Sequence, residues 1–325
     1  MPDYKGIQGT AVQNFAGDPP APVTGQIWYN STTGQFKFKD TIPTGAWATG
    51  GSLNTARTST TGAGTQTAGL YFGGRSPPAT IVLNNESYNG STWTELGDLN
   101  TSRAYVSGCG ATNTAALCFG GAGTPGLPVS GATESWNGTS WTSSPNSLNT
   151  ARYDIAPAGT NTAALAISGY STLTIGNVES WNGTSWSEIQ DVNTARYAAG
   201  AAGIQTAALI FGGIPGSPTA TESWNGSSWT EVNDLNTNRA SLYGCGTNTA
   251  ALGFGGNPTA SATETWNGTN WTTVNSLNTA RLSLGGTGTN TVGLAMGGNI
   301  GPSNLASTEE WNAPFTATEI ITTTV

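Results

Sequence analysis

The sequence predicts an all-β fold, on three observations. An arginine follows a nearly constant Leu-Asn-Thr-Ala lead-in six times, with 42 to 49 residues between successive copies. Each copy continues into short apolar runs bounded by Gly and Asn, the pattern of β-hairpins. No part of the repeat has apolar residues at helical spacing. Units of this length, built from strands and turns, predict a six-bladed β-propeller.

Within one unit, the parts follow in a fixed order. An apolar strand ends in a glycine doublet such as Gly120-Gly121, and a loop of variable length follows. Next comes a segment with two tryptophans around an Asn-Gly pair, as in residues 134–141. Asn-Gly favours a type I′ turn, which needs positive φ at two residues. We therefore predict a two-residue turn that places Glu134 opposite Trp141. A four-residue loop, the alternative, would keep Glu134 on the same face.

A glutamate stands two residues before the first aromatic residue of this segment in every unit, on the face that the tryptophans share. A carboxylate among tryptophans is costly unless it is paired. The repeated arginine is the natural partner, so we predict one structural ion pair per blade. The glutamates are Glu86, Glu134, Glu179, Glu222, Glu264 and Glu309, and the arginines are Arg57, Arg103, Arg152, Arg196, Arg239 and Arg281. The tryptophans are expected to pack between blades.

The two ends of the repeat region complete each other. The last unit reaches Trp311 and then runs into Ala313-Pro314, so its partner strand is missing. Trp47 precedes the first repeated arginine by ten residues, the spacing found in four other units. We predict that a strand around Trp47 pairs with one around Trp311, which closes the ring and removes open sheet edges. The expected domains are an N-terminal β-hairpin extension, 1–44, the propeller, 45–312, and a C-terminal β-strand tail, 313–325.

Composition excludes several functions. The formal charge is −8, and the repeat region carries arginines but no lysine, so we predict no nucleic-acid binding. The sequence has neither a signal-peptide pattern nor an apolar run long enough for a membrane span. It has no histidine, and its three cysteines form no metal-binding pattern. We expect no metal, no cofactor, no catalytic residue and no enzyme activity.

The repeat resembles the kelch repeat in its lead-in, its glycine doublet and the aromatic residues that flank a tight turn. The resemblance covers about residues 45–312 and implies a propeller that binds proteins or glycans. The chain departs from the common kelch pattern by using Trp where Tyr is usual, as at Trp136, and by lacking histidine in the inner strand. A glycosidase or sialidase function is the weaker alternative, because the segment 135–141 resembles an Asp-box without its aspartate or its spacing.

The N-terminal segment has a second resemblance. Gly17-Asp18-Pro19, followed by Gly-Gln-Ile-Trp-Tyr-Asn-Ser-Thr-Thr-Gly-Gln-Phe-Lys-Phe at 25–38, is similar to a segment common in tail fibres and other virion proteins of tailed bacteriophages. Its alternating residues predict a hairpin around Ser31–Gly34. The resemblance implies a virion structural protein on the particle surface, bound to other virion proteins through residues 1–44. A non-viral protein- or glycan-binding module and a homo-oligomer remain open.

The loops after the glycine doublets vary in length and content, whereas the turns at the other face hardly vary. Variable loops on a rigid scaffold are the usual place for recognition. We predict that this face meets a host-surface glycan or protein through Arg75, Leu127, Tyr170 and Ile300 as exposed residues. Simple tolerance of insertions is the alternative. Asp154, an acid on an inner strand, is expected at the mouth of the central channel.

Overall fold

The computed structural model describes residues 12–20, 26–41, 45–123, 128–216, 219–313 and 316–321. Within these ranges the chain forms β-strands and turns without any helix, so the predicted all-β class is confirmed. Accordingly, the described ranges offer no helix with the length and apolar character of a membrane span. The chain divides into two compact units, one made of Met1–Gly45 with Ala313–Val325 and the other of Ala46–Asn312.

The unit Ala46–Asn312 consists of six four-stranded sheets, which we number as blades 1 to 6. From the innermost strand outward, blade 1 is β5 (Thr61–Thr65), β6 (Ala68–Phe72), β9 (Asn85–Tyr88) and β10 (Trp93–Glu95), and blade 2 is β11 (Ser107–Thr112), β12 (Ala115–Phe119), β13 (Thr133–Trp136) and β14 (Trp141–Ser143). Blade 3 is β15 (Ala156–Gly159), β16 (Ala164–Tyr170), β17 (Thr174–Trp181) and β18 (Trp186–Ile189), and blade 4 is β19 (Gly200–Ile204), β20 (Ala207–Phe211), β21 (Thr221–Trp224) and β22 (Trp229–Val232). Blade 5 is β23 (Tyr243–Thr247), β24 (Ala250–Phe254), β25 (Thr263–Trp266) and β26 (Trp271–Val274), and blade 6 is β27 (Gly285–Gly288), β28 (Val292–Met296), β31 (Thr308–Asn312) and β4 (Ala46–Thr49). Two short hairpins, β7 (Arg75–Ser76) with β8 (Thr80–Ile81) and β29 (Asn299–Ile300) with β30 (Ser303–Asn304), lie in the loops of blades 1 and 6.

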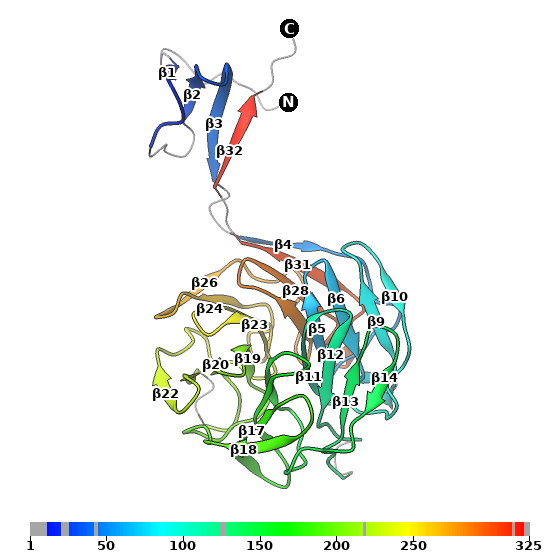
Figure 1. Ribbon diagram of the computed structural model, residues 1–325. Helices are drawn as coiled ribbons and strands as arrows, with labels where there is room; N and C mark the ends of the chain where they lie inside the picture. Colours follow the sequence, from blue (N-terminus) through cyan, green and yellow to red (C-terminus); the bar gives the residue numbers. More distant parts are fainter. Residues whose placement is uncertain are drawn as a thin grey trace. The chain divides into compact units, whose positions relative to one another are not determined.

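The six blades form a closed ring. Their innermost strands contact one another in the cyclic order β5, β11, β15, β19, β23 and β27, and β27 contacts β5 in turn. The colours of Figure 1 follow this order around the ring, from cyan through green and yellow to orange. The predicted six-bladed propeller is therefore confirmed.

The closing strand comes from the other end of the chain. β4 pairs antiparallel with β31, and Trp47 lies directly opposite Trp311, with 5.6 Å between their ring centroids. Figure 1 shows blue β4 beside red β31. The predicted closure around these two tryptophans is confirmed. Because β4 supplies the fourth strand of blade 6, the sheet edge that β31 would otherwise expose is paired.

The predicted two-residue Asn-Gly turn is wrong. Trp136 lies opposite Trp141, so a four-residue loop joins their strands. The side-chain oxygen of Asn137 accepts the backbone N–H groups two and three residues later, and in this loop Gly138 takes the positive φ, 94°. Asparagine therefore serves here as a side-chain cap of the loop rather than as a left-handed residue. The observed pairing of β13 with β14 differs from the predicted register by two residues, so Glu134 still shares a face with both tryptophans.

Each repeated arginine is buried and pairs with the glutamate on the third strand of its own blade. The pairs are Arg57–Glu86, Arg103–Glu134, Arg152–Glu179, Arg196–Glu222, Arg239–Glu264 and Arg281–Glu309. In blade 1, Arg57 Nη2 lies 2.7 Å from Glu86 Oε1, and both side chains have zero exposure. The predicted structural ion pairs are confirmed in all six blades.

The rest of the lead-in binds the same carboxylate and the outer strand. In blade 1, the backbone N–H of Asn54 donates to Glu86 Oε2 at 2.7 Å, and its side-chain amide donates to the carbonyl of Trp93. The guanidinium of Arg57 also donates to the carbonyl of Gly73, the first glycine of the doublet. The backbone-to-carboxylate bond of this asparagine recurs in the other five blades. The lead-in is thus repeated because it connects the segment before each blade's innermost strand to the third and outer strands of that blade.

The arginine backbone joins each blade to the preceding one. The N–H of the second doublet glycine donates to the arginine carbonyl of the next blade, as from Gly74 to Arg103 at 2.9 Å, and the bond from Gly298 to Arg57 closes the cycle. This glycine has φ near 90° in most blades, and a Cβ at Gly74 would lie 2.0 Å from a Thr60 methyl carbon. Only glycine fits such a position without strain. The doublet therefore serves contact between blades.

The outer-strand tryptophans fill the space between blades, as predicted. Trp186 packs against Phe119 of the preceding blade with 5.0 Å between ring centroids, and its indole N–H donates to the hydroxyl of Thr133 in that blade. Trp271 packs in the same way against Phe211. Large aromatic surfaces with a satisfied indole donor are suited to burial.

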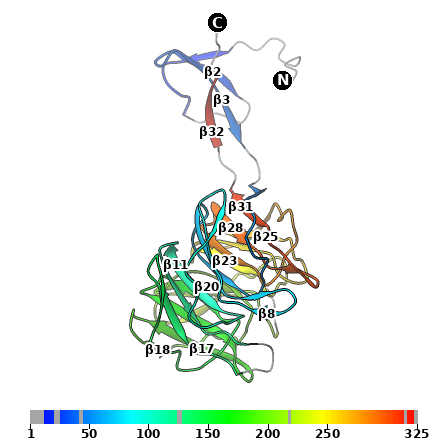
Figure 2. The same ribbon diagram turned by 90° about the vertical axis from the view of Figure 1, so that its right-hand side faces the viewer.

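The other unit is a four-stranded sheet built from both ends of the chain. Its order is β1 (Gln13–Phe15), β2 (Ile27–Asn30), β3 (Gln35–Thr41) and β32 (Thr316–Ile321). The predicted hairpin is confirmed as β2 and β3. The C-terminal strand, for which the sequence offered no partner, pairs antiparallel with β3, and Figure 2 shows these two strands side by side.

One carboxylate organises this sheet. Asp18 Oδ1 accepts hydrogen bonds from Asn30 Nδ2 at 2.9 Å, Lys37 Nζ at 3.0 Å and Trp28 Nε1 at 3.1 Å. These three donors, with Asn30 contributing most, hold the pKa of Asp18 below its ordinary value. All four residues belong to the segments 17–19 and 25–38, so a shared contact explains why those residue types occur together.

Removing one charge of a buried pair is expected to destabilise the propeller strongly. Glu222→Gln leaves Arg196 charged and unpaired inside blade 4, which costs about 3–5 kcal/mol of unfolding free energy. Glu231, directly opposite Glu222 on the neighbouring strand, is exposed, so Glu231→Gln should change stability by less than about 0.5 kcal/mol. Urea unfolding of both variants measures the difference. Equal stabilities of the two variants would contradict the structural role of the pair.

The closing strand β4 is expected to contribute as much to the free energy of unfolding as the outer strand of any other blade. Trp47→Ala should cost about 3–5 kcal/mol, as should Trp271→Ala at the equivalent position of blade 5, because the two side chains are 6% and 5% exposed. Urea unfolding again gives both values. A cost below about 1 kcal/mol for Trp47→Ala alone would argue against closure through β4.

Candidate binding site at the mouth of the central channel

A ring of left-handed residues encircles one end of the channel. The residue two positions after each repeated arginine has φ between 50° and 56° without being glycine. We call this set the αL ring: Ser59, Tyr105, Asp154, Ala198, Ser241 and Ser283. Each backbone N–H donates to the carbonyl of the ring member in the preceding blade, at 2.7 to 3.3 Å, and the bonds form a closed cycle. These bonds offset the strain of left-handed backbone at non-glycine residues.

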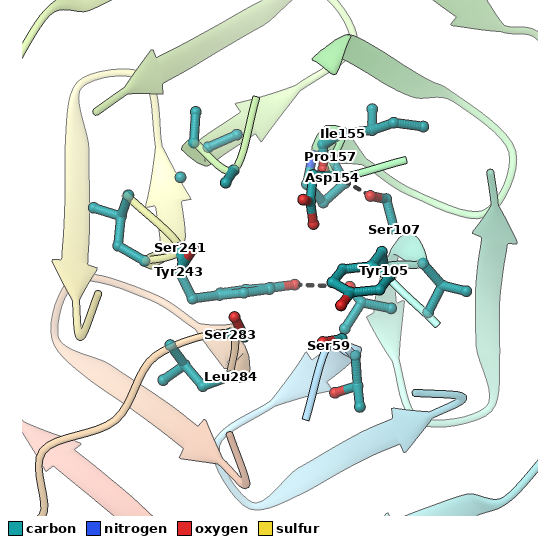
Figure 3. Close-up of a pocket in the computed structure, with 18 of the residues that line it drawn as sticks. Ser59, Tyr105, Ser107, Asp154, Ile155, Pro157, Ser241, Tyr243, Ser283 and Leu284 are labelled. Carbon is teal, nitrogen blue, oxygen red and sulfur yellow. Dashed lines mark hydrogen bonds between the residues drawn. The ribbon is translucent and has the colours of Figure 1, made fainter. Parts of the chain in front are cut away.

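The αL ring and the residues that follow it line a cavity of about 70 Å³. Figure 3 shows Tyr105, Asp154 and Tyr243 directed into this space from different sides. Tyr243 projects from β23, and its hydroxyl lies 3.2 Å from both Gly62 O and Thr61 Oγ1. Tyr243 also lines a second cavity of about 330 Å³ farther along the channel. Its side chain therefore separates the two cavities.

Asp154 is the carboxylate of the first cavity. Among the described residues, its side chain has no hydrogen-bond or ion-pair partner, and Figure 3 shows its oxygens facing the cavity. Loss of hydration raises the pKa of Asp154 to about 7. The group therefore changes charge near neutral pH. Its expected place at the channel mouth is confirmed.

A row of tyrosines extends from this cavity across three blades. We call Tyr105, Tyr153, Tyr170 and Tyr197 the tyrosine row. Successive ring centroids lie 5.6, 5.4 and 5.2 Å apart, and all four side chains are half-buried. Arg75 Nη1 donates to the Tyr105 hydroxyl at 2.9 Å, which places a cation at one end of the row. The arrangement offers aromatic faces, phenolic hydroxyls, one cation and one titratable acid.

The four predicted binding residues have different outcomes. Arg75 and Tyr170 are half-buried rather than exposed, because Arg75 contacts Tyr105 and the Tyr170 ring packs between two other tyrosines. Ile300 is 47% exposed on β29, in the loop of blade 6, whereas the tyrosine row lies in blades 2 to 4. Leu127 lies outside the described residues.

Sequence reasoning missed three members of the row: Tyr105, Tyr153 and Tyr197. They stand one or two residues after a repeated arginine, where other blades have residues such as Thr58, Ala104 and Ala240. A signal was present, because tyrosine at these positions departs from the small residues of the repeat. The loops after the glycine doublets vary more in length and content, so these substitutions inside the regular part of the unit are the weaker signal.

The described residues supply no cluster of three or more potential metal ligands. The three cysteines are free and buried. Burial raises the pKa of Cys118 to about 11 and that of Cys109 and Cys245 to about 12, so these thiols stay protonated at neutral pH. Protonated thiols are poor metal ligands and poor nucleophiles.

Comparisons with known proteins identify the fold. No family model matches the chain, and no curated protein matches it in sequence. The solved structure of YjhT matches 82% of this chain and 99% of its own chain, with a TM-score of 0.69 and 12% sequence identity. At this identity the similarity shows the β-propeller fold alone. Because 333 chains of solved structures match, and one fold hosts many functions, the function must be argued from the site.

Replacing Asp154 is expected to stabilise the protein in a pH-dependent way. Its pKa is raised to about 7 in the folded state, against about 3.9 in an unfolded chain. The folded state therefore holds the proton more tightly, and the contribution of Asp154 to stability falls as the pH rises from about 4 to about 7. Asp154→Asn, which also tolerates the left-handed backbone, should remove this loss and stabilise by up to about 4 kcal/mol at pH 8.

Urea unfolding at pH 5 and pH 8 checks this expectation. The gain from Asp154→Asn should be clearly larger at pH 8 than at pH 5. Asp98→Asn, at an exposed position of blade 1, is the control and should change stability little at either pH. A destabilised Asp154→Asn variant at pH 8 would show that the carboxylate is held by favourable contacts instead.

Proposed function

We propose that the protein is a structural appendage of a tailed-bacteriophage virion, whose propeller binds a molecule of the host surface. The observation that carries the proposal is the division of the chain. Both chain ends form one small sheet, and everything between them forms a closed ring. A protein that must be attached at one part and recognise a ligand with another needs this kind of division.

The small sheet supports the attachment role. The segments that resemble phage virion proteins supply β2, β3 and the carboxylate of Asp18 that connects them. Because β32 adds to the same sheet, the chain passes between the two units twice. Two connections tether the propeller to its attachment unit more firmly than a single linker. Virion proteins are the proposed partners of this sheet, and the particle surface is the proposed location.

The channel mouth supports binding rather than catalysis. The first cavity has Asp154 as its carboxylate, and its described lining includes neither a second acid nor a basic side chain. Glycoside hydrolysis commonly uses two carboxyl groups that flank the scissile bond, and this lining supplies one. The tyrosine row, in contrast, offers the amphipathic rings that are common in recognition surfaces. Purified protein is expected to release no product from chromogenic glycosides.

A non-viral binding module is the second candidate. The tyrosine row and Arg75 favour it as much as they favour the virion protein, because both candidates use the same face for recognition. The two differ in what the sheet of β1, β2, β3 and β32 does.

Locating the protein tests the proposal. Tailed phage particles purified from bacteria that produce this chain are expected to contain it, by mass spectrometry and by immunogold labelling of the particle surface. Asp18→Ala removes the acceptor shared by Trp28, Asn30 and Lys37 and should lower the amount per particle. Asp98→Ala, on the propeller, should leave that amount unchanged. Absence of the wild-type protein from the particles would refute the virion assignment and favour the second candidate.

A further inference from the structure

The fold does not require the tyrosine row. The position of Tyr153 and Tyr197, directly after the repeated arginine, holds alanine in blades 2 and 5, at Ala104 and Ala240. Those blades have the same backbone bridge at this position, to the residue after the doublet. A small side chain is therefore sufficient for the structure. Tyrosine at this position in blades 3 and 4 is therefore not needed for the fold and is available for another role.

The polar groups of the row are free to bind. Among the described residues, the hydroxyls of Tyr153, Tyr170 and Tyr197 have no hydrogen-bond partner, whereas the Tyr105 hydroxyl accepts from Arg75. The rings are half-buried and contact one another in sequence. Each ring thus presents an apolar surface beside an unpaired hydroxyl that can donate and accept. A ligand that alternates apolar patches and hydroxyls matches this pattern.

The backbone beside the row is already paired. Tyr153 and Tyr170 form a β-bridge, Tyr197 bridges Ile214, and the αL ring uses the neighbouring N–H and carbonyl groups. No free strand edge is therefore available here for an added peptide strand, which binds through its main chain. A ligand of the row must be recognised by side chains.

Charge selects among the remaining ligands. Asp154, the residue after Tyr153, faces the first cavity together with Tyr105, and the whole chain has a formal charge of −8. An anionic polymer would meet repulsion from the carboxylate and gain one cation, Arg75, which already donates to the Tyr105 hydroxyl. An uncharged ligand with many hydroxyls can donate to the Asp154 carboxylate and stack its C–H faces on the rings.

From these contacts we propose that the tyrosine row, with Arg75 and Asp154, binds a neutral saccharide chain that lies across blades 2 to 4. The sugar rings stack on the tyrosine rings, and sugar hydroxyls pair with the free phenolic hydroxyls and with Asp154. The inference rests on the proposed recognition function of this face and names its ligand class.

A glycan array of neutral and acidic oligosaccharides, followed by calorimetric titration of the strongest ligand, tests the proposal with the full chain. Wild-type protein should bind at least one neutral oligosaccharide. Tyr153→Ala and Tyr170→Ala should each weaken that binding about tenfold or more, because each removes a stacking surface. Leu282→Ala is the matched control, since Leu282 is the blade 6 counterpart of Tyr153 and lies outside the row. It should bind as the wild type does.

A second pair of variants separates binding from folding. Tyr153→Phe and Tyr197→Phe keep the rings and remove one hydroxyl each, so they should weaken binding about two- to tenfold while their melting temperatures stay close to that of the wild type. A purely structural row would leave binding unchanged in the Phe variants.

Four results would overturn the proposal. They are binding of no neutral saccharide, binding of acidic saccharides alone, binding of a proline-rich peptide in place of saccharides, and saccharide binding that is insensitive to Tyr153→Ala and Tyr170→Ala. None of them bears on the virion assignment, which depends on the particle measurement, so the two proposals can fail separately.

Discussion

The structure depends on the buried arginine that begins each blade. Its guanidinium pairs with a glutamate of its own blade, as Arg57 does with Glu86, and its carbonyl accepts the glycine N–H of the preceding blade. One residue therefore holds a sheet together and joins it to its neighbour. Taking two charges out of water is costly. Part of this cost is offset because the asparagine of the lead-in and the doublet carbonyl form further hydrogen bonds with the pair, which leave Arg57 Nε without a partner among the described residues. Six such units form a closed cycle, in which the inner and outer strands of each blade remain as short sheet edges.

The ring of blades also determines the backbone conformation and the side-chain directions at the channel mouth. Two residues after each arginine, the backbone enters the left-handed region and forms the αL ring, so side chains at these positions are directed toward the axis. Most blades place a serine or an alanine there, and Tyr105 and Asp154 are the exceptions. The strain of the backbone is a structural requirement, repeated in every blade. Within the αL ring, the chemistry of the cavity is set by these two residues, and the rest of the tyrosine row lies outside the ring.

The ring could be predicted from the sequence because the residues that build it recur in every unit. The spacing of the arginines indicated six blades, the glutamate on the aromatic face indicated the ion pairs, and Trp47 indicated the closing strand. Local geometry was harder: the Asn137 side chain caps a four-residue loop, which the Asn-Gly pattern does not distinguish from a type I′ turn. Two residues of the candidate site were named from the sequence. Arg75 and Tyr170 lie in it, but their contacts with Tyr105 and Tyr197 join residues from different blades, and no spacing within one unit reveals such contacts.

Hydrogen exchange at the second doublet glycines tests the closed ring most directly. The amides of Gly74, Gly121, Gly169, Gly213, Gly256 and Gly298 each donate to an arginine carbonyl of the next blade. In a closed ring, all six amides are expected to exchange slowly and at similar rates, through unfolding of the whole ring. The bond from Gly298 to Arg57 crosses the point of closure. Exchange at Gly298 that is about 100-fold faster than at the other five, which corresponds to about 3 kcal/mol less protection, would contradict a ring in which all six junctions are equivalent.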